Sequence, residues 1–325
     1  MSRHHRLLPA AALGVGLVAG CPAAATSRIP AAAQADSAYV TIMFGRTIFA
    51  PSCAPRAGMR TLFQTADDLR SLGLSAVGGV VVDRIGETER RCVNGVTYPT
   101  WADLTRLRSA YRWTFVSQGM TYSDMTAFTT DDERFQESAA TLPVLAERGH
   151  RQAWGLFNYP NDKQDAASQA IVTEYFSFGR LYTRTPAVNP RSALTTYPYQ
   201  LVTLDTLGGQ CNNPDLPCYD FPVRSDRRTT PLPEVVKVLR PKPGEYGVVQ
   251  FYRLVSGKSG TMGQPGAWDC TSPDWRNRWT GQPENYCRNT FLSALRMRNK
   301  AAVVTTPDAV AMAWGRGNPG LRDGR

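Results

Sequence analysis

The run SQGMTYSD at residues 117–124 places amide, phenol and carboxylate groups directly after a strand-like segment at residues 111–116. Gln118, Tyr122 and Asp124 are its strongest candidates for hydrogen bonds to a ligand. Zinc sites use nitrogen, sulfur or carboxylate ligands, and only Asp124 is of such a type. A carboxylate in this position is more typical of a cap on the following turn than of a base, so we expect Asp124 to cap that turn.

The same run resembles the second motif of the polysaccharide deacetylases, the carbohydrate esterases with a NodB-type domain. In that family the pattern is Ser-His-x-x-Thr-His after a strand, and the two histidines hold a zinc ion. Gln118 and Tyr122 stand at the two histidine positions in this chain. The resemblance therefore implies the family's frame without its metal ligands.

Two more motifs show the same loss. In the family, the first strand ends in Thr-Phe-Asp-Asp-Gly, which supplies the catalytic base and a metal ligand. Here the apolar run at residues 38–44 is followed by Gly45 and Arg46 at the carboxylate positions. Near the end of the chain, Tyr252 occupies the position of the histidine that acts as catalytic acid in the family.

The run FNYPND at residues 157–162 resembles the family's third motif, an aromatic-Pro turn that lines one wall of the groove. The arginine often found there is missing, and Asn158 is the nearest residue to its position. The resemblance makes Tyr159 and Asp162 further candidates for ligand contacts. Tyr159 and the tryptophans near it are also common as core residues.

The histidine count argues against the family's zinc site independently of any single motif. The chain contains three histidines, and His4 and His5 belong to an expected leader. His150 follows a helix end and precedes a strand, so we expect it at the amino end of that strand, whereas the motifs above lie at the carboxyl ends of theirs. A site of two histidines and one aspartate cannot be built from one histidine, and we expect no metal and no cofactor.

Arg46 has two interpretations. It is either a solvated loop arginine or a guanidinium that projects into the former metal site. We favour the second, because Gln118, Tyr122 and Tyr252 offer polar partners there. The groove would then be positive where active family members bind a cation, and it would attract an anionic ligand group.

The first 21 residues are typical of a signal peptide, with a basic start and an apolar stretch at residues 7–20. The stretch ends in VAGC, which resembles a bacterial lipobox with Cys21 as the lipidated residue. Ordinary cleavage near Ala25 or Ala35 is the competing prediction. The protein is thus predicted to be exported, and either anchored by a lipid on Cys21 or secreted at the bacterial cell surface.

Seven cysteines are an odd number for an exported chain, which agrees with a separate role for Cys21. The other six are expected to form three disulfides, and six cysteines allow 15 pairings in principle. Proximity in the sequence favours pairing between neighbours. The expected pairs are Cys53 with Cys92, Cys211 with Cys218, and Cys270 with Cys287.

Strand-like and helix-like runs alternate along the chain, which predicts a parallel sheet, and six to eight such units favour a barrel. The resemblance implies a distorted (β/α)7-type barrel at residues 38–315, as one α/β domain with long disulfide-stapled loops. Residues 22–37 are expected to be a flexible tether and residues 316–325 a disordered tail. Strands are expected at residues 38–44, 76–82, 111–116, 152–157, 177–182, 199–204, 246–251 and 301–304, helices at 60–72, 101–111, 131–149, 163–175 and 290–298, a last helix capped at 306–308, and loops at 205–243 and 256–287.

The net charge of +10 is consistent with attraction to a polyanion, and in an envelope protein this means cell-wall polymers. No basic run with interleaved aromatics is present, so nucleic acid is not an expected partner. We therefore predict a deacetylase-like envelope lipoprotein, inactive as an enzyme, that binds glycan or a protein partner through the former active-site groove. The alternatives are an active metal-independent hydrolase of amide bonds in cell-wall glycans and a purely structural scaffold.

Overall fold

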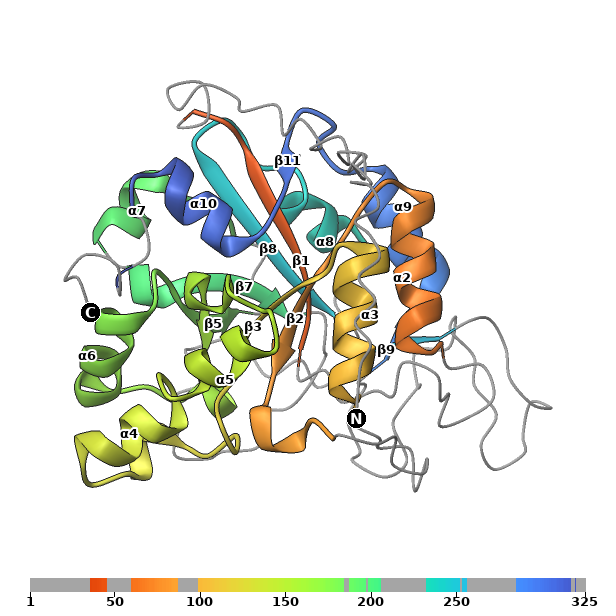
Figure 1. The fold of residues 1–325 in the computed structure, drawn as a ribbon. Coiled ribbons are helices and arrows are strands. Elements are labelled where there is room, and N and C mark those ends of the chain that lie inside the picture. Colours follow the sequence, from red (N-terminus) through yellow and green to blue (C-terminus); the bar gives the residue numbers. More distant parts are fainter. Residues whose placement is uncertain are drawn as a thin grey trace, which may run out of the picture.

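Seven parallel strands form a closed barrel surrounded by helices in the computed structural model (Figure 1). The structure describes residues 36–45, 60–86, 99–183, 187–196, 198–205, 232–251, 253–255, 285–316 and 319. Strand pairing runs around the ring from β1 to β8, and β8 pairs back onto β1 along the whole of β1. The barrel strands are β1 (Tyr39–Phe44), β2 (Val77–Val80), β3 (Thr114–Ser117), β4 (Phe157–Asn158), β5 (Gly179–Thr183), β7 (Leu201–Asp205) and β8 (Glu245–Phe251). The predicted (β/α)7-type barrel is confirmed.

The barrel is irregular around β1. The start of β1 pairs with β11 (Val303–Val304), whereas only its end pairs with β2. A short antiparallel strand, β6 (Asn189–Pro190), adds to the start of β8. Two further strands, β9 (Arg253–Val255) and β10 (Asn285–Cys287), form a separate parallel pair.

Helices follow most strands and cover the outside of the barrel (Figure 1). Capping boxes fix where the first two of these helices begin, with Thr61 and Thr100 as their N-caps. Across the described ranges, no helix combines the length and apolar character needed to cross a membrane. The α-helices are α2 (Leu62–Ser71), α3 (Trp101–Tyr111), α4 (Asp131–Glu137), α5 (Thr141–Glu147), α6 (Ala166–Tyr175), α7 (Arg191–Thr196), α8 (Leu232–Val238), α9 (Arg288–Arg296) and α10 (Pro307–Ala313).

Alternation along the strands separates two apolar layers. Val40, Ile42 and Phe44 of β1 belong to the cluster that packs against the outer helices. Tyr39 and Met43 point the other way, into a cluster that fills the barrel interior together with residues of α10. α10 thereby closes the end of the barrel at which β1 and β8 begin, and the opposite end carries the carboxyl ends of the strands (Figure 1).

The single helix predicted at residues 131–149 is wrong, because the structure has two helices there, α4 and α5. Pro143 explains the break. In one continuous helix it would lack the hydrogen bond to residue 139 and clash with that carbonyl, whereas it is tolerated in the first turn of α5. The N-cap of α4 is Thr130, which forms a capping box with Glu133.

Three other predicted boundaries also change. The expected strand at residues 152–157 is mostly a 3₁₀ turn, η3 (Ala153–Gly155), followed by the two-residue β4. The predicted loop at residues 205–243 contains α8, whose Leu232 and Pro233 form its first turn, a position that tolerates proline. α6 begins at Ala166, three residues later than expected, because Asp165 is its N-cap.

Candidate functional site

Polar side chains fill the barrel interior near the carboxyl ends of the strands. Gln118 directly follows β3, Asn158 ends β4, Arg180 lies in β5 and Gln250 lies in β8. All four side chains are fully buried. The guanidinium of Arg180 donates from Nη1 to Oε1 of Gln250 over 2.6 Å. We call these four residues the interior polar layer.

Gly79 of β2 makes room for two of the amides in this layer. A Cβ atom at position 79 would lie 2.6 Å from Oε1 of Gln118 and 2.8 Å from Nδ2 of Asn158. Real Cβ atoms do not approach other heavy atoms so closely. The absence of a side chain at Gly79 therefore lets the Gln118 and Asn158 amides occupy the same part of the interior.

The loop after β3 carries Tyr122 away from Gln118. Gly119 and Tyr122 have positive φ angles of 94° and 74°, which turn the chain sharply at both positions. Tyr122 is half-buried, and the Arg84 guanidinium carbon lies 5.2 Å from the centre of its ring. Of the predicted site residues, Gln118 thus joins the interior polar layer, whereas Tyr122 contacts Arg84 beside the strand end.

Asp124 ends this loop as a cap, as predicted. Its Oδ1 accepts hydrogen bonds from the backbone N–H and the hydroxyl of Thr126. Its Oδ2 lies 2.5 Å from Nζ of Lys163. Burial alone would raise the pKa of Asp124, but the hydrogen bonds from Lys163 and Thr126 hold it below its usual value. An ionised, doubly engaged carboxylate is a poor general base.

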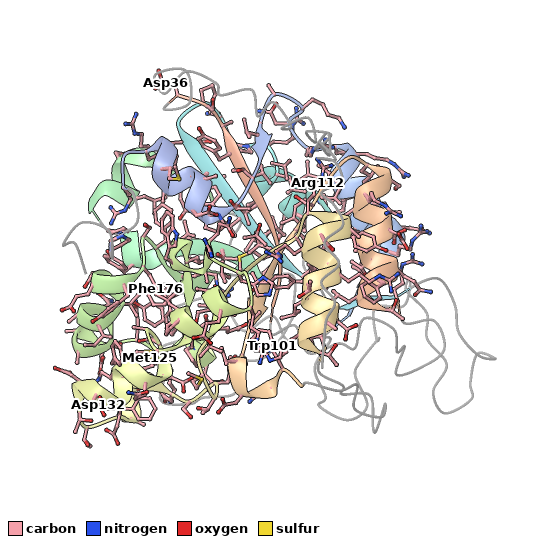
Figure 2. All side chains as sticks on the ribbon, viewed as in Figure 1. Asp36, Trp101, Arg112, Met125, Asp132 and Phe176 are labelled. Atoms are coloured by element: carbon pink, nitrogen blue, oxygen red, sulfur yellow. The ribbon has the colours of Figure 1, made fainter. Side chains whose placement is uncertain are left out.

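The third motif contributes less to the site than expected. Tyr159 is fully buried, and its ring packs edge-on against Phe157 with the centroids 5.3 Å apart. Met125 and Phe176, labelled in Figure 2, belong to the same apolar cluster. Burial raises the pKa of Tyr159 well above its usual value. Tyr159 is therefore a core residue and not an exposed groove wall, and Asp162 lies half-buried in the following turn with a φ of 57°.

Several predicted residues lie outside the described part of the chain. They include the two remaining site candidates, Arg46 and Tyr252. The side chain of Cys287, in β10, is also not described. The same holds for Cys21, Cys53, Cys92, Cys211, Cys218 and Cys270.

His150 is buried outside the barrel interior. Its ring lies 4.9 Å from the Phe115 ring and 6.4 Å from the Trp101 ring, which Figure 2 labels at the start of α3. Phe115 belongs to the layer between the strands and the helices. His150 therefore lies in this layer and not at the far end of the barrel, where the sequence predicted it. Burial and the nearby Arg108 lower the pKa of His150 to about 4.

The described residues of the site do not fit the zinc ion that the sequence resemblance implies for active family members. Within the described ranges, no three or more His, Cys, Asp or Glu residues come together as a metal site would need. The interior polar layer instead holds neutral amides and the permanent positive charge of Arg180. A fixed guanidinium repels a second cation, whereas it favours carboxylate or phosphate oxygens.

Sequence reasoning missed Arg180, Gln250 and Gly79 as parts of this site. The sequence did carry a signal for Arg180 and Gln250, because side chains alternate between the two faces along a strand. Arg180 is two residues from Phe178, and Gln250 is two residues from Val248, and both apolar residues face the barrel interior. A polar residue in register with an interior apolar residue therefore marks the interior polar layer.

Neither a protein-family model nor a curated protein sequence matches this chain. Matches exist among solved structures. The deacetylase PplD of Streptococcus pyogenes in complex with acetate has a TM-score of 0.37 at 10% identity, over 50% of this chain and 63% of that one. The polysaccharide deacetylase BC0361 of Bacillus cereus has a TM-score of 0.33 at 14% identity, over 45% and 40% of the two chains. A family 4 carbohydrate esterase of Streptomyces lividans has a TM-score of 0.30 at 17% identity, over 51% and 77%.

Their descriptions name a deacetylase, a polysaccharide deacetylase and a family 4 carbohydrate esterase. This chain spans less than two thirds of the length of the first two. At these identities and scores the likeness is limited to the fold, which the strand pairing described above already establishes.

Proposed function

We propose that this protein is a deacetylase-like envelope protein that binds cell-wall glycan at the carboxyl ends of the barrel strands and does not hydrolyse it through zinc. The interior polar layer carries this proposal. It places neutral amides at Gln118 and Asn158, and a fixed cation at Arg180, at the end of the barrel where a metal site would need ligands. In this proposal the protein is exported and anchored through a lipid on Cys21.

The way in which the polar residues at the strand ends are held agrees with glycan binding without zinc-dependent hydrolysis. The Arg180–Gln250 pair is fully buried and hydrogen-bonded, so it supports the strand ends from inside the barrel and leaves contact with a ligand to the loops. Tyr122 and Arg84 present an aromatic ring and a guanidinium on the loops that follow β3 and β2. The net charge of +10 favours the anionic polymers of a cell wall over neutral ones.

Two assays on the purified mature protein test this proposal. Cosedimentation with purified peptidoglycan sacculi should remove the protein from solution in a saturable manner. Acetate release from N-acetylated chitooligosaccharides should equal the rate without protein, with or without added zinc. Absence of sedimentation would contradict glycan binding, and acetate release would favour the active hydrolase instead.

A matched pair of double variants locates the binding surface. Arg84→Ala with Tyr122→Ala removes a guanidinium–aromatic contact at the strand ends. Arg106→Ala with Phe63→Ala removes the same kind of contact between α3 and α2 on the outside of the barrel. The Arg84/Tyr122 double variant should bind sacculi severalfold more weakly than the wild type, whereas the Arg106/Phe63 double variant should bind like the wild type. Equal effects of the two double variants would contradict the assignment of the glycan-binding surface to the strand ends.

A further inference from the structure

Glu137 places a carboxylate where a helix and the protein interior both disfavour it. It is the last residue of α4, and only 3% of it is exposed. The C-terminal end of a helix carries partial negative charge, and burial removes the water that would solvate an anion. Burial raises the pKa of Glu137, while hydrogen bonds from residues 121–123 oppose this effect. The carboxylate therefore needs strong partners of its own.

Those partners are supplied by the loop that follows β3. Oε1 of Glu137 accepts the backbone N–H of Tyr122 over 2.8 Å and that of Ser123 over 3.0 Å. Oε2 accepts the hydroxyl of Thr121 over 2.7 Å and its backbone N–H over 3.1 Å. Three successive backbone N–H groups that converge on one anion form a nest. Because both oxygens accept, the geometry fits the carboxylate form.

The loop adopts its shape around this carboxylate. A Cβ atom at Gly119 would collide with Oε1 of Glu137, so only glycine fits there. Tyr122 keeps a φ of 74°, which is unfavourable for a residue with a side chain and persists only where surrounding contacts hold it. Met120 donates its backbone N–H to the carbonyl of Glu137 over 2.8 Å, so the backbone of α4 joins the loop as well.

We infer that Glu137 is a positioning residue, an internal anion that holds the loop at residues 119–124 in the form that presents Tyr122 to a ligand. The part of this inference that concerns the ligand rests on the proposed function. Glu137 itself has no exposed face with which to contact a glycan. Its effect on binding passes through the backbone of Tyr122, whose ring contacts Arg84 beside the strand end.

Hydrogen exchange tests the nest without any ligand. In Glu137→Gln the amide group presents an N–H₂ to the donors of the loop, so exchange at the amides of residues 121–123 should become at least tenfold faster. Glu133→Gln is the matched control, because Glu133 lies on the same helix and also accepts backbone N–H groups, but those of Thr129 and Thr130. It should leave exchange in the loop unchanged. Unchanged exchange in Glu137→Gln would overturn the inference.

A second set of variants covers the case in which Glu137→Gln fails to fold. Thr121→Val removes one donor and keeps the carboxylate, and it should accelerate the same exchange by a smaller factor. In Glu137→Ala, added formate should restore protection of the loop amides, whereas chloride at equal ionic strength should not. Equal effects of the two salts, or no effect of Thr121→Val, would contradict a nest built for a carboxylate.

Cosedimentation with sacculi then tests the link to binding. Glu137→Gln should lower the affinity for sacculi at least tenfold, and Glu133→Gln should leave it unchanged. If the wild-type protein does not bind sacculi, the proposed function fails, while the exchange experiment still decides the role of Glu137. If Glu137→Gln binds as well as wild type although its loop exchanges faster, the loop does not position the ligand contact.

Discussion

At the scale of single residues, Gly79 tests how tightly the interior polar layer is packed. Gly79→Ala should lower the free energy of unfolding by about 1–3 kcal/mol, because the new methyl group overlaps the amides of Gln118 and Asn158. Urea unfolding of Gly79→Ala, Asn158→Ala and the double variant gives the coupling between the sites. The double variant should lose less stability than the sum of the single variants. Additive losses would mean that the two positions do not compete for space.

His150 provides a pH-dependent prediction at the same scale. The pKa of His150 is lowered from 6.5 to about 4 in the folded protein, so protonation favours the unfolded chain. This part of the stability is present above pH 6.5 and is lost as the pH falls from about 6.5 towards 4. The full loss is about 3 kcal/mol.

The replacement His150→Phe isolates this contribution. Phenylalanine is similar in shape and cannot titrate, so the difference in unfolding free energy between the two proteins should change between pH 7 and pH 4. Denaturant titrations at several pH values measure it. Parallel stability curves for the two proteins would show that the pKa of His150 is the same in the folded and unfolded states, which would contradict this prediction.

At the scale of elements, a buried carboxylate links α2 to α9. Asp68 of α2 lies 2.7 Å from Nε of Arg60, and Arg288 at the start of α9 donates to both of its oxygens. Asp68→Ala would leave two arginines without their shared partner, and we expect a loss of about 2–3 kcal/mol. Thermal and urea unfolding both measure this loss.

Asp67 is the matched control, since it is the neighbouring aspartate on the same helix. Its ion pair with Arg70 is exposed, with side-chain exposures of 50% and 57%. Exposed pairs contribute little, so Asp67→Ala should cost about 0.5 kcal/mol or less. Equal losses for the two variants would show that the Asp68 cluster is no stronger than a surface pair.

At the scale of the whole molecule, we predict that the purified mature protein holds no stoichiometric zinc. Gln118 and Tyr122 replace the expected histidines, and Arg180 adds a fixed positive charge to the interior. The melting temperature should be the same with added zinc and with a chelator. Elemental analysis that finds one tightly bound zinc per chain would contradict this prediction.

The cysteines provide a second prediction for the whole chain. Non-reducing peptide mapping should recover Cys53 with Cys92, Cys211 with Cys218 and Cys270 with Cys287, and mass analysis should find Cys21 lipidated. Each bridge should contribute about 2–4 kcal/mol by restricting the unfolded chain. Free thiols among the six would contradict the pairing, and a mature chain with an unmodified Cys21 would contradict the anchor.

Local patterns made part of the fold predictable. The strand predicted at residues 38–44 became β1 (Tyr39–Phe44), and the helix predicted at residues 101–111 became α3, with Thr100 as its N-cap. Both depend on side-chain periodicity and on caps within a few residues. The helix at residues 131–149 was predicted wrongly because its apolar spacing continued across Pro143, whose backbone restriction outweighs that spacing.

The sequence by itself determined the alternation of strands and helices, and with it the barrel, because those signals are local. It also determined which residue types are scarce, since His150 is the one histidine beyond residue 5 and cannot supply two histidine ligands. Only the tertiary structure decided which polar groups meet. Arg180 and Gln250 are 70 residues apart and contact each other because β8 closes the ring next to β7 and β1. Glu137 likewise reaches the loop after β3 only through the packing of α4, which the spacing of residues along the chain does not specify.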